Sequence, residues 1–161
     1  MIETKRLFLR PLALSDEKDL LEYQSIPEVV RYIPWPERTP EQVHEALLKA
    51  ISQNDVVNEG DWIVLAIVSK ETKKVIGQLN LSIKNSVNKY GEFGYVINPA
   101  YSGNGYVTEA AKALLTWAFA NNVVAPSQTT AVPAIAVRTG VAFTVMLKLT
   151  AFEHPLALVT V

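Results

Sequence analysis

One stretch of the sequence, residues 91–119, joins a strand pattern to a helix pattern through a turn that contains two glycines. Residues 93–97 alternate in the manner of a strand and are rich in aromatic and β-branched side chains. Gly103 and Gly105 follow, and from Tyr106 onward apolar residues recur at helical spacing. A helix N-terminus leaves several N–H groups without intrahelical partners, so the stretch is compatible with an anion site, usually for phosphate, or with a simple tight connection.

The length and composition of the chain exclude several classes of protein. We expect a single domain, residues 1–161, because this length can bury a core without disulfides or metals. A net charge of −1 disfavours nucleic acid as a partner, and the absence of cysteine excludes a disulfide framework and a thiol nucleophile. His44 and His154 lack ligand spacing, so no metal site is expected. The first residues lack the apolar core of a signal peptide and no apolar run is long enough to span a membrane, which favours a cytoplasmic protein.

The remaining patterns predict an α/β (α+β) fold. Residues 6–11 read as a strand, and Ser15 is the expected cap of the following helix. Residues 39–42 combine a threonine, a proline and a glutamine at the spacing of a capping box, which predicts a helix to about Gln53. Three further strand patterns separated by short polar turns indicate an antiparallel meander flanked by helices; they cover residues 62–68, 75–83 and 91–97.

Two sequence motifs resemble the GNAT superfamily of N-acetyltransferases. The pattern Pro-x-x-x-Gly-x-Gly-Tyr-x-Thr-Glu-Ala at residues 99–110 resembles the acyl-CoA-binding turn of that family. The opening ETKRLFLRPLALSDEKDLL resembles the N-terminus of the branch that acetylates the N-terminal amine, alanine included, of ribosomal proteins. The resemblance implies a GNAT-like central mixed, mostly antiparallel sheet flanked by helices, with a splayed strand at the cofactor site. It also implies acetyl-CoA as the acetyl donor.

The resemblance assigns roles to residues on the strand and in the turn. The backbone groups of Val96 and Ile97 would pair with the pantetheine arm, and Thr108 would either donate its hydroxyl to a phosphate oxygen or act as a cap. The amides that would surround the pyrophosphate belong to Gly103, Asn104, Gly105, Tyr106 and Val107. Ser102 stands where the family usually has a basic or amide residue and Val107 where it has a small one, so we expect CoA to bind more weakly than is typical.

The other half of the expected site is less defined by the sequence. Acetyl transfer to an amine needs a proton acceptor, and Glu92 is the candidate because it lies on the strand before the turn; a solvent-facing position beside Lys89 is the alternative. Tyr32 and Trp35 stand where the family builds a wall of the acceptor site, although an aromatic residue in a proline-rich loop can equally cover the core. Glu109 is expected to interact favourably with the helix dipole.

From about Val123 the chain departs from the family pattern. Residues 123–161 contain three charged side chains, against 28 in the first 122 residues, and no tyrosine follows Tyr106. The family's usual general acid is a tyrosine in this part. The tail is therefore divergent but functional, degraded, or translated from an altered reading frame. Its pattern predicts a strand at 129–137, a helix at 140–149 and a strand at 156–161, and its apolar surface is a candidate for homodimer formation.

The leading hypothesis is an acetyl-CoA-dependent N-acetyltransferase that acts on a primary amine, from a peptide N-terminus or a small molecule, by direct attack in a ternary complex. The alternative is a non-catalytic or degraded CoA-binding or interaction module of the same fold. A dinucleotide site is poorly supported, because Thr108 occupies the third glycine position of the fingerprint and no acidic residue follows at the required distance.

Overall fold

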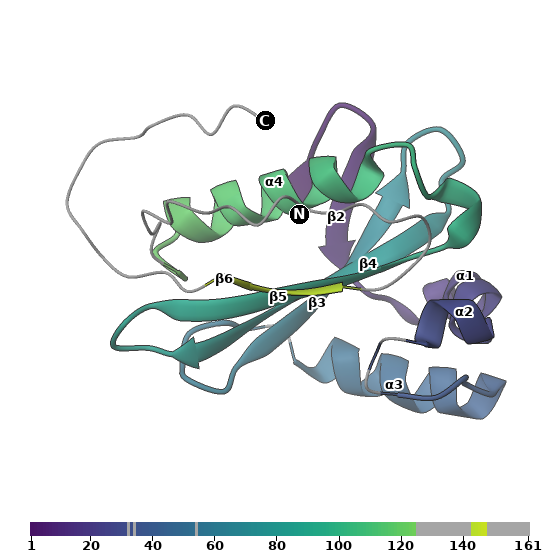
Figure 1. The fold of residues 1–161 in the computed structure, drawn as a ribbon, viewed down its shortest axis with the longest axis horizontal. Coiled ribbons are helices and arrows are strands. Elements are labelled where there is room, and N and C mark those ends of the chain that lie inside the picture. Colours follow the sequence, from purple (N-terminus) through teal and green to yellow (C-terminus); the bar gives the residue numbers. More distant parts are fainter. Residues whose placement is uncertain (32, 34, 54, 125–142, 148–161) are drawn as a thin grey trace.

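A computed structural model of the chain describes residues 1–31, 33, 35–53, 55–124 and 143–147. The strands in this part form one sheet in which every neighbouring pair is antiparallel and the spatial order follows the chain order (Figure 1). The predicted fold class is confirmed. The strands are β1 (Ile2–Glu3), β2 (Leu7–Pro11), β3 (Trp62–Ser69), β4 (Val75–Asn85), β5 (Tyr90–Ile97) and β6 (Phe143–Leu147).

Helices cover both faces of the sheet, with α4 on one face and α1, α2 and α3 on the other (Figure 1). None of the described helices has the length and apolarity of a membrane span. The α-helices are α1 (Glu17–Gln24), α2 (Pro27–Val30), α3 (Pro40–Ser52) and α4 (Tyr106–Ala120), and the 3₁₀ turns are η1 (Leu14–Asp16) and η2 (Pro99–Tyr101).

The two helix starts predicted from sequence have different outcomes. The capping box of α3 is confirmed, because the Gln42 amide donates to Thr39 Oγ1 at 3.4 Å and the Thr39 amide donates to Gln42 Oε1 at 3.0 Å. The expected Ser15 cap is wrong, since α1 begins directly after Asp16. The buried Asp16 carboxylate accepts from the Ala13 amide at 2.8 Å and pairs with Arg10 at 2.7 Å, so it holds the entry to α1 in place of a serine.

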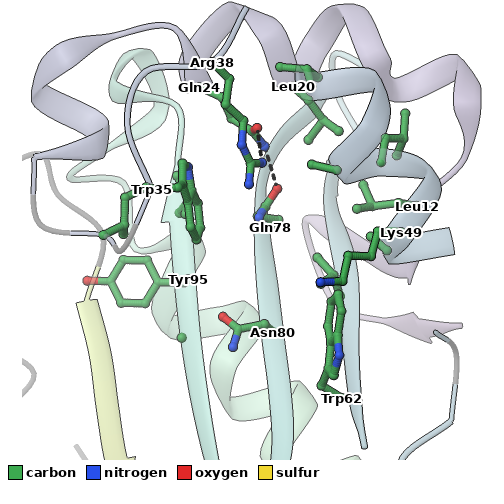
Figure 2. A pocket seen from close by; sticks show the side chains of 18 residues that line it. Leu12, Leu20, Gln24, Trp35, Arg38, Lys49, Trp62, Gln78, Asn80 and Tyr95 are labelled. Carbon is green, nitrogen blue, oxygen red and sulfur yellow. Dashed lines mark hydrogen bonds between the residues drawn. The ribbon is translucent and has the colours of Figure 1, made fainter. Parts of the chain in front are cut away.

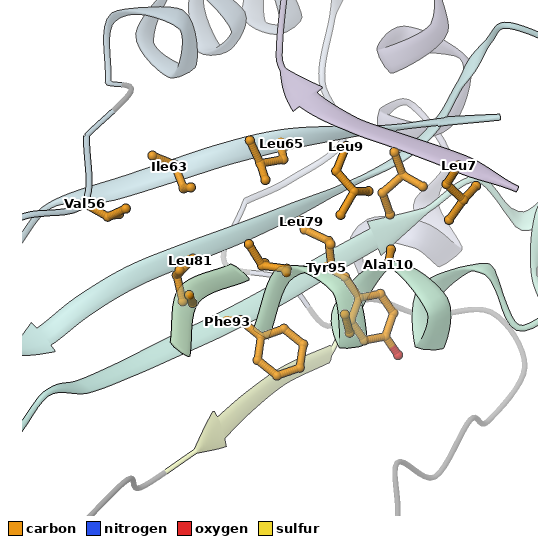
Figure 3. Close-up of a cluster of buried hydrophobic side chains, with 14 of the residues drawn as sticks. Leu7, Leu9, Val56, Ile63, Leu65, Leu79, Leu81, Phe93, Tyr95 and Ala110 are labelled. Atoms are coloured by element: carbon orange, nitrogen blue, oxygen red, sulfur yellow. The ribbon is translucent and has the colours of Figure 1, made fainter. Parts of the chain in front are cut away.

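A separate apolar cluster fills each face of the sheet. On the α4 face, Leu79 and Leu81 of β4 pack beneath Ala110, Leu114 and Ala118 of the helix, and all are at most 2% exposed (Figure 3). The other cluster packs α1 and α3 against β3, β4 and β5; its most buried members are Leu20, Tyr23, Val43, Leu47 and Ala66. Burial on both sides explains why β3 reads as an unbroken apolar run.

The described part of the tail adds an edge strand to the sheet. The backbone of β6 pairs antiparallel with β5, from Gly91 opposite Leu147 to Tyr95 opposite Phe143. The helix expected at 140–149 is therefore wrong at these residues, because an open strand edge offers unpaired N–H and C=O groups that another strand can satisfy. The strands expected at 129–137 and 156–161, and most of the apolar surface considered for dimer formation, lie outside the described residues.

Candidate functional site

The turn between β5 and α4 has the backbone geometry that its glycines predict. Gly103 has φ 76° and Gly105 has φ 74°, both in the left-handed region that glycine tolerates. A Cβ added at Gly103 would meet no atom within 4 Å, so this side of the turn is open. Gly105 is the N-cap of α4, and the first hydrogen bond of the helix is donated by Glu109 to the Gly105 carbonyl at 3.0 Å.

The turn and the first residues of α4 also have backbone amides that no described residue uses. No hydrogen bond between described residues uses the backbone N–H groups of residues 103–108, whereas the Asn104 side chain closes the turn by donating to the carbonyls of Tyr101 and Ser102 at 3.2 Å and 3.0 Å. Amides at a helix N-terminus, together with the helix dipole, favour an anion such as a phosphate. The amides predicted to surround the pyrophosphate, from Gly103 to Val107, are thus unused within the described residues, and their role stays a prediction. The Thr108 side chain is partly buried.

A residue from the start of the chain, Arg6, holds this turn in place. Its Nη1 donates to the Asn104 carbonyl at 2.9 Å, its Nε donates to Glu109 Oε2 at 2.7 Å, and its guanidinium lies 4.4 Å from the centre of the Tyr106 ring. Glu109 Oε1 also accepts from the Arg6 amide at 2.9 Å and from the Thr4 hydroxyl at 2.6 Å. Glu109 therefore connects α4 to the N-terminal segment by hydrogen bonds. These contacts are additional to the favourable interaction with the helix dipole that was expected for it.

These contacts set the charge state of Glu109. Burial alone would raise the pKa of this carboxyl, but the hydrogen bonds from Thr4 and Arg6 outweigh it, and the pKa is lowered from its ordinary value. Sequence reasoning missed Arg6, because its partners lie about a hundred residues away and no local pattern marks the contact.

Next to the turn, the end of β5 has an outer backbone edge that pairs with no described strand. Within the described residues β6 reaches only to Tyr95, so it does not pair with Val96 and Ile97. The register between β4 and β5 is continuous over residues 91–97. The Asn98 amide donates to the Ile76 carbonyl at 2.8 Å. By the alternation of an antiparallel ladder, the backbone groups of Val96 then face β4, while those of Ile97 face the open side.

A cleft of about 310 Å³ lies on the other face of the sheet, between the α1–α3 helices and strands β3, β4 and β5 (Figure 2). Trp35 lines this cleft and packs on the apolar cluster as well, so it covers the core, and its role in an acceptor site stays a prediction. Tyr32 lies outside the described residues. The described residues that line the cleft are the aromatic residues Trp35, Trp62 and Tyr95, Gly94 and aliphatic residues, and the polar residues Gln24, Arg38, Lys49, Gln78 and Asn80.

A chain of side-chain hydrogen bonds crosses the floor of this cleft. Arg38 Nη1 donates to Gln24 Oε1 at 2.7 Å, and Gln24 Nε2 donates to Gln78 Oε1 at 3.0 Å (Figure 2). The hydroxyl of Tyr23 donates to the same Gln78 oxygen at 3.3 Å, and burial raises the pKa of this tyrosine. Arg38 lies 4.6 Å from the centre of the Trp35 ring, and burial lowers the pKa of its guanidinium.

Sequence reasoning also missed most of these polar residues, although one signal was present. Gln78 and Asn80 alternate with Leu79 and Leu81 on a strand whose neighbours are buried, and polar groups at such positions need a partner or a ligand. Arg38 carries no comparable local signal, because its partner Gln24 lies at the end of α1, 14 residues earlier and on the other side of α2 in the chain.

Glu92 lies on the cleft side of the sheet but outside the cleft lining. It is opposite Ser82 in the register, two pairs beyond the Asn80–Gly94 pair that borders the cleft. Its carboxylate accepts from the Tyr90 hydroxyl at 3.1 Å and pairs with Lys84 Nζ at 3.3 Å. Two residues along a strand span about 7 Å, so Glu92 lies about that far along β5 from Gly94, which lines the cleft. Among the described residues, no group of three or more His, Cys, Asp or Glu side chains is placed to hold a metal ion.

Comparison with known proteins identifies the fold and the family. The family profile described as acetyltransferase (GNAT) domain matches residues 6–141. The chain is 32% identical over 116 residues to the uncharacterized N-acetyltransferase p20 of Bacillus licheniformis, covering 72% of this chain and 64% of that protein. It is 31% identical over 119 residues to the uncharacterized N-acetyltransferase YnaD of Bacillus subtilis, covering 73% and 65%. The chain thus spans just under two thirds of the length of these curated relatives.

Solved structures show the same architecture. The acetyltransferase (GNAT family) of Bacillus anthracis superposes with a TM-score of 0.66 at 25% identity, over 76% of this chain and 68% of that one. The spermidine N-acetyltransferase of Vibrio cholerae, solved in complex with CoA and spermine, superposes with a TM-score of 0.61 at 20% identity, over 75% and 68%, and so shows the fold alone. The profile match, the relatives and the sheet with its glycine turn agree: the chain belongs to the acetyltransferase (GNAT) domain family.

Proposed function

We propose that the chain forms the core of an N-acetyltransferase that moves an acetyl group from acetyl-CoA to a primary amine by direct attack in a ternary complex. One observation carries the proposal: at the open glycine turn that begins α4, no hydrogen bond between described residues uses the backbone N–H groups of residues 103–108. Such a turn suits the pyrophosphate of CoA. Membership of the GNAT family supports the same donor.

The backbone of β5 would extend this donor site. The N–H and C=O groups of Ile97 face the side that β6 leaves open, so an amide-bearing arm can pair there as an added strand would. Val96 belongs to the same proposal, although its backbone groups are directed toward β4. Thr108 would add a hydroxyl donor at the helix start. The donor would then be held mainly by main-chain groups.

The chemistry then requires little from side chains. A thioester is already reactive, so orientation of the amine against the acetyl carbon supplies a large part of the rate, on the order of 7–11 kcal/mol for well-placed groups. Glu92 is the proposed proton acceptor, through water, because it lies on the cleft side of β5. Trp35 lines the cleft in which the acceptor amine would lie, and Tyr32 is proposed for the same wall.

For the acceptor, the opening motif favours the branch that acts on peptide N-termini, and a small-molecule amine is the other proposal. The neighbour from Vibrio cholerae is a spermidine N-acetyltransferase, which shows that this fold accommodates a small amine. Both acceptors present a primary amine that must lose a proton before it attacks.

Thermal unfolding with acetyl-CoA tests the donor site. A ligand that binds only the folded state raises its stability by about 2.7 kcal/mol at a hundredfold excess over Kd. We expect the unfolding temperature to rise with acetyl-CoA but not with an equal concentration of acetate, and calorimetry to show one site. If millimolar acetyl-CoA produces neither a shift nor binding heat, the proposed donor site is wrong.

A second function, a CoA-binding module without turnover, is favoured by one observation. No tyrosine follows Tyr106 in the sequence, so its later part lacks the residue type that the family uses there as general acid. Release of free thiol from acetyl-CoA across a panel of amines separates the two functions. Amine-dependent release establishes the enzyme, whereas donor binding without release across the panel establishes the module.

A further inference from the structure

The charged side chains that line the cleft on the α1–α3 face, among the described residues, are all positive. Arg38 and Lys49 are its charged lining residues, and no Asp or Glu of the described chain belongs to the lining. Lys49 is exposed on α3, whereas Arg38 lies partly buried with its guanidinium against Trp35 (Figure 2). A cleft of this kind attracts an anionic group and repels a polycation.

Arg38 has no described carboxylate to balance its charge. Its closest contacts are the neutral oxygen of Gln24 and the ring of Trp35, and no ion pair within the described residues includes it. Partial burial of an unpaired guanidinium is costly, and in keeping with this the pKa of Arg38 is lowered. A bound anion would remove that cost and occupy the remaining N–H groups of the guanidinium, which suits the two oxygens of a carboxylate.

The hydrogen-bond chain from Arg38 through Gln24 shows that the side-chain amide of Gln78 also offers a donor to the cleft. Arg38 has no acceptor atom, so the Gln24 atom that it contacts at 2.7 Å must be the oxygen. The nitrogen of Gln24 then donates to Gln78 at 3.0 Å, which fixes the Gln78 atom as its oxygen, and Tyr23 donates to that oxygen too. The Gln78 NH₂ group is left at the cleft without a partner among the described residues.

We propose that this cleft selects an acceptor amine that carries a carboxylate close to the amine, with Arg38 and the NH₂ group of Gln78 binding the carboxylate. The inference rests on the proposed acetyltransferase function and names its acceptor class. Free amino acids and peptides that begin with an acidic residue share this chemistry. Asn80 lies next to Gln78 on the same face of β4, and its side-chain oxygen is available to the ammonium group.

Binding to the full chain in the absence of CoA tests the inference. The matched probes are L-alanine and L-alaninamide, which differ only in the carboxylate, with spermidine as the polycation. Calorimetry and the fluorescence of Trp35 follow the titrations, with Trp35→Phe identifying its share of the signal. Since hydrogen bonds to a charged partner are the stronger class, we expect L-alanine to bind about 10- to 100-fold more tightly than L-alaninamide.

Substitution of Arg38 tests whether this residue causes the preference for L-alanine over L-alaninamide. Arg38→Gln should remove the preference for L-alanine over L-alaninamide, and Arg38→Lys, which keeps the charge but loses the planar fork, should restore part of it. Lys18→Gln, an exposed cation of α1 outside the cleft, is the matched control and should leave the preference unchanged. The unfolding temperature of each variant shows whether it is folded. A preference that survives Arg38→Gln overturns the inference.

The binding experiments distinguish free amino acids from acidic peptide N-termini as the source of the carboxylate. They also distinguish failure of the acceptor proposal from failure of the proposed acetyltransferase function. Tight binding of aspartyl-alaninamide identifies acidic peptide N-termini, and binding of L-alanine without it identifies free amino acids. If neither L-alanine nor aspartyl-alaninamide binds more tightly than L-alaninamide and spermidine, or if no probe binds, the inference is wrong even when acetyl-CoA stabilises the protein. Carboxylate binding without any effect of acetyl-CoA instead overturns the proposed function.

Discussion

The two faces of the sheet are built in contrasting ways. On the α4 face the helix packs on an apolar cluster, and the groups proposed to bind a ligand are backbone amides at the N-terminus of the helix. On the α1–α3 face a cleft of about 310 Å³ interrupts the packing, and its polar groups are side chains such as Arg38 and Gln78. Main-chain groups are the same in every residue except proline, whereas side chains differ. The proposed donor site therefore depends on backbone conformation, and the proposed acceptor site depends on residue identity.

The largest expected effect tests whether both faces are true cores. Leu114→Ala on the α4 face and Leu47→Ala on the other face should each lower the free energy of unfolding by about 2–5 kcal/mol, because these side chains are at most 1% exposed. Leu48→Ala, at a neighbouring position that is 48% exposed, is the control. Urea denaturation measures all three. A small loss at Leu47 would mean that the α1–α3 face contributes little to stability.

The next expected effect concerns chemistry on the cleft face. If Glu92 accepts the proton, Glu92→Gln lowers kcat about 100-fold at neutral pH, while acetyl-CoA affinity, measured by calorimetry, stays the same. Glu71→Gln, an exposed carboxylate in the turn between β3 and β4, should leave kcat unchanged. Equal turnover of the two variants would remove Glu92 from the mechanism.

A third prediction concerns the hydrogen bonds of Glu109 with Thr4 and Arg6, which lie at α4 and away from the cleft. Glu109→Gln should cost about 1–3 kcal/mol at pH 7, since the carboxylate accepts from Thr4 and Arg6. The folded-state pKa of Glu109 is lowered, so its contribution is complete above the ordinary value of 4.5 and is lost as the pH falls through the lower, folded-state pKa. Unfolding at pH 7 and pH 3 measures this. The variant and the parent protein should converge in acid; a constant difference would assign the loss to packing.

The smallest expected effect tests the dependence of the donor half on backbone conformation. Gly103→Ala should lower stability by about 1–2 kcal/mol, because alanine is strained at φ 76°, and it should weaken acetyl-CoA binding about tenfold by obstructing close approach. Gly60→Ala is a matched control: Gly60 has φ 92° and equally open surroundings, but lies in the loop before β3. It should show the same loss of stability with unchanged affinity. Equal affinity of the two variants would place the donor elsewhere.

Local interactions were predictable from the sequence. The capping box at Thr39 and Gln42 and the left-handed glycines at 103 and 105 depend on residues a few positions apart, so their patterns identified them correctly. The strands β3, β4 and β5 were also found, because burial imposes a period on the side chains.

Interactions between distant elements were not predictable in this way. The contact of Arg6 with Asn104 and Glu109 and the contact of Gln24 with Gln78 depend on how the elements meet, which no single segment records. The helix expected at 140–149 illustrates the same limit, since residues 143–147 are a strand beside β5. An apolar run of that length suits either structure, and the available edge decides.

The Arg6 contact also has a consequence for the order of folding. Thr4 and Arg6 are separated from Glu109 by more than a hundred residues, so the turn at 103–105 acquires its support only after a loop of that length has closed. Contacts of such high sequence separation form slowly. During synthesis, Thr4 and Arg6 must therefore wait for α4 to emerge before their contacts with the turn and Glu109 can form. We expect the ability to bind acetyl-CoA to appear late in refolding, after most of the helical signal has returned.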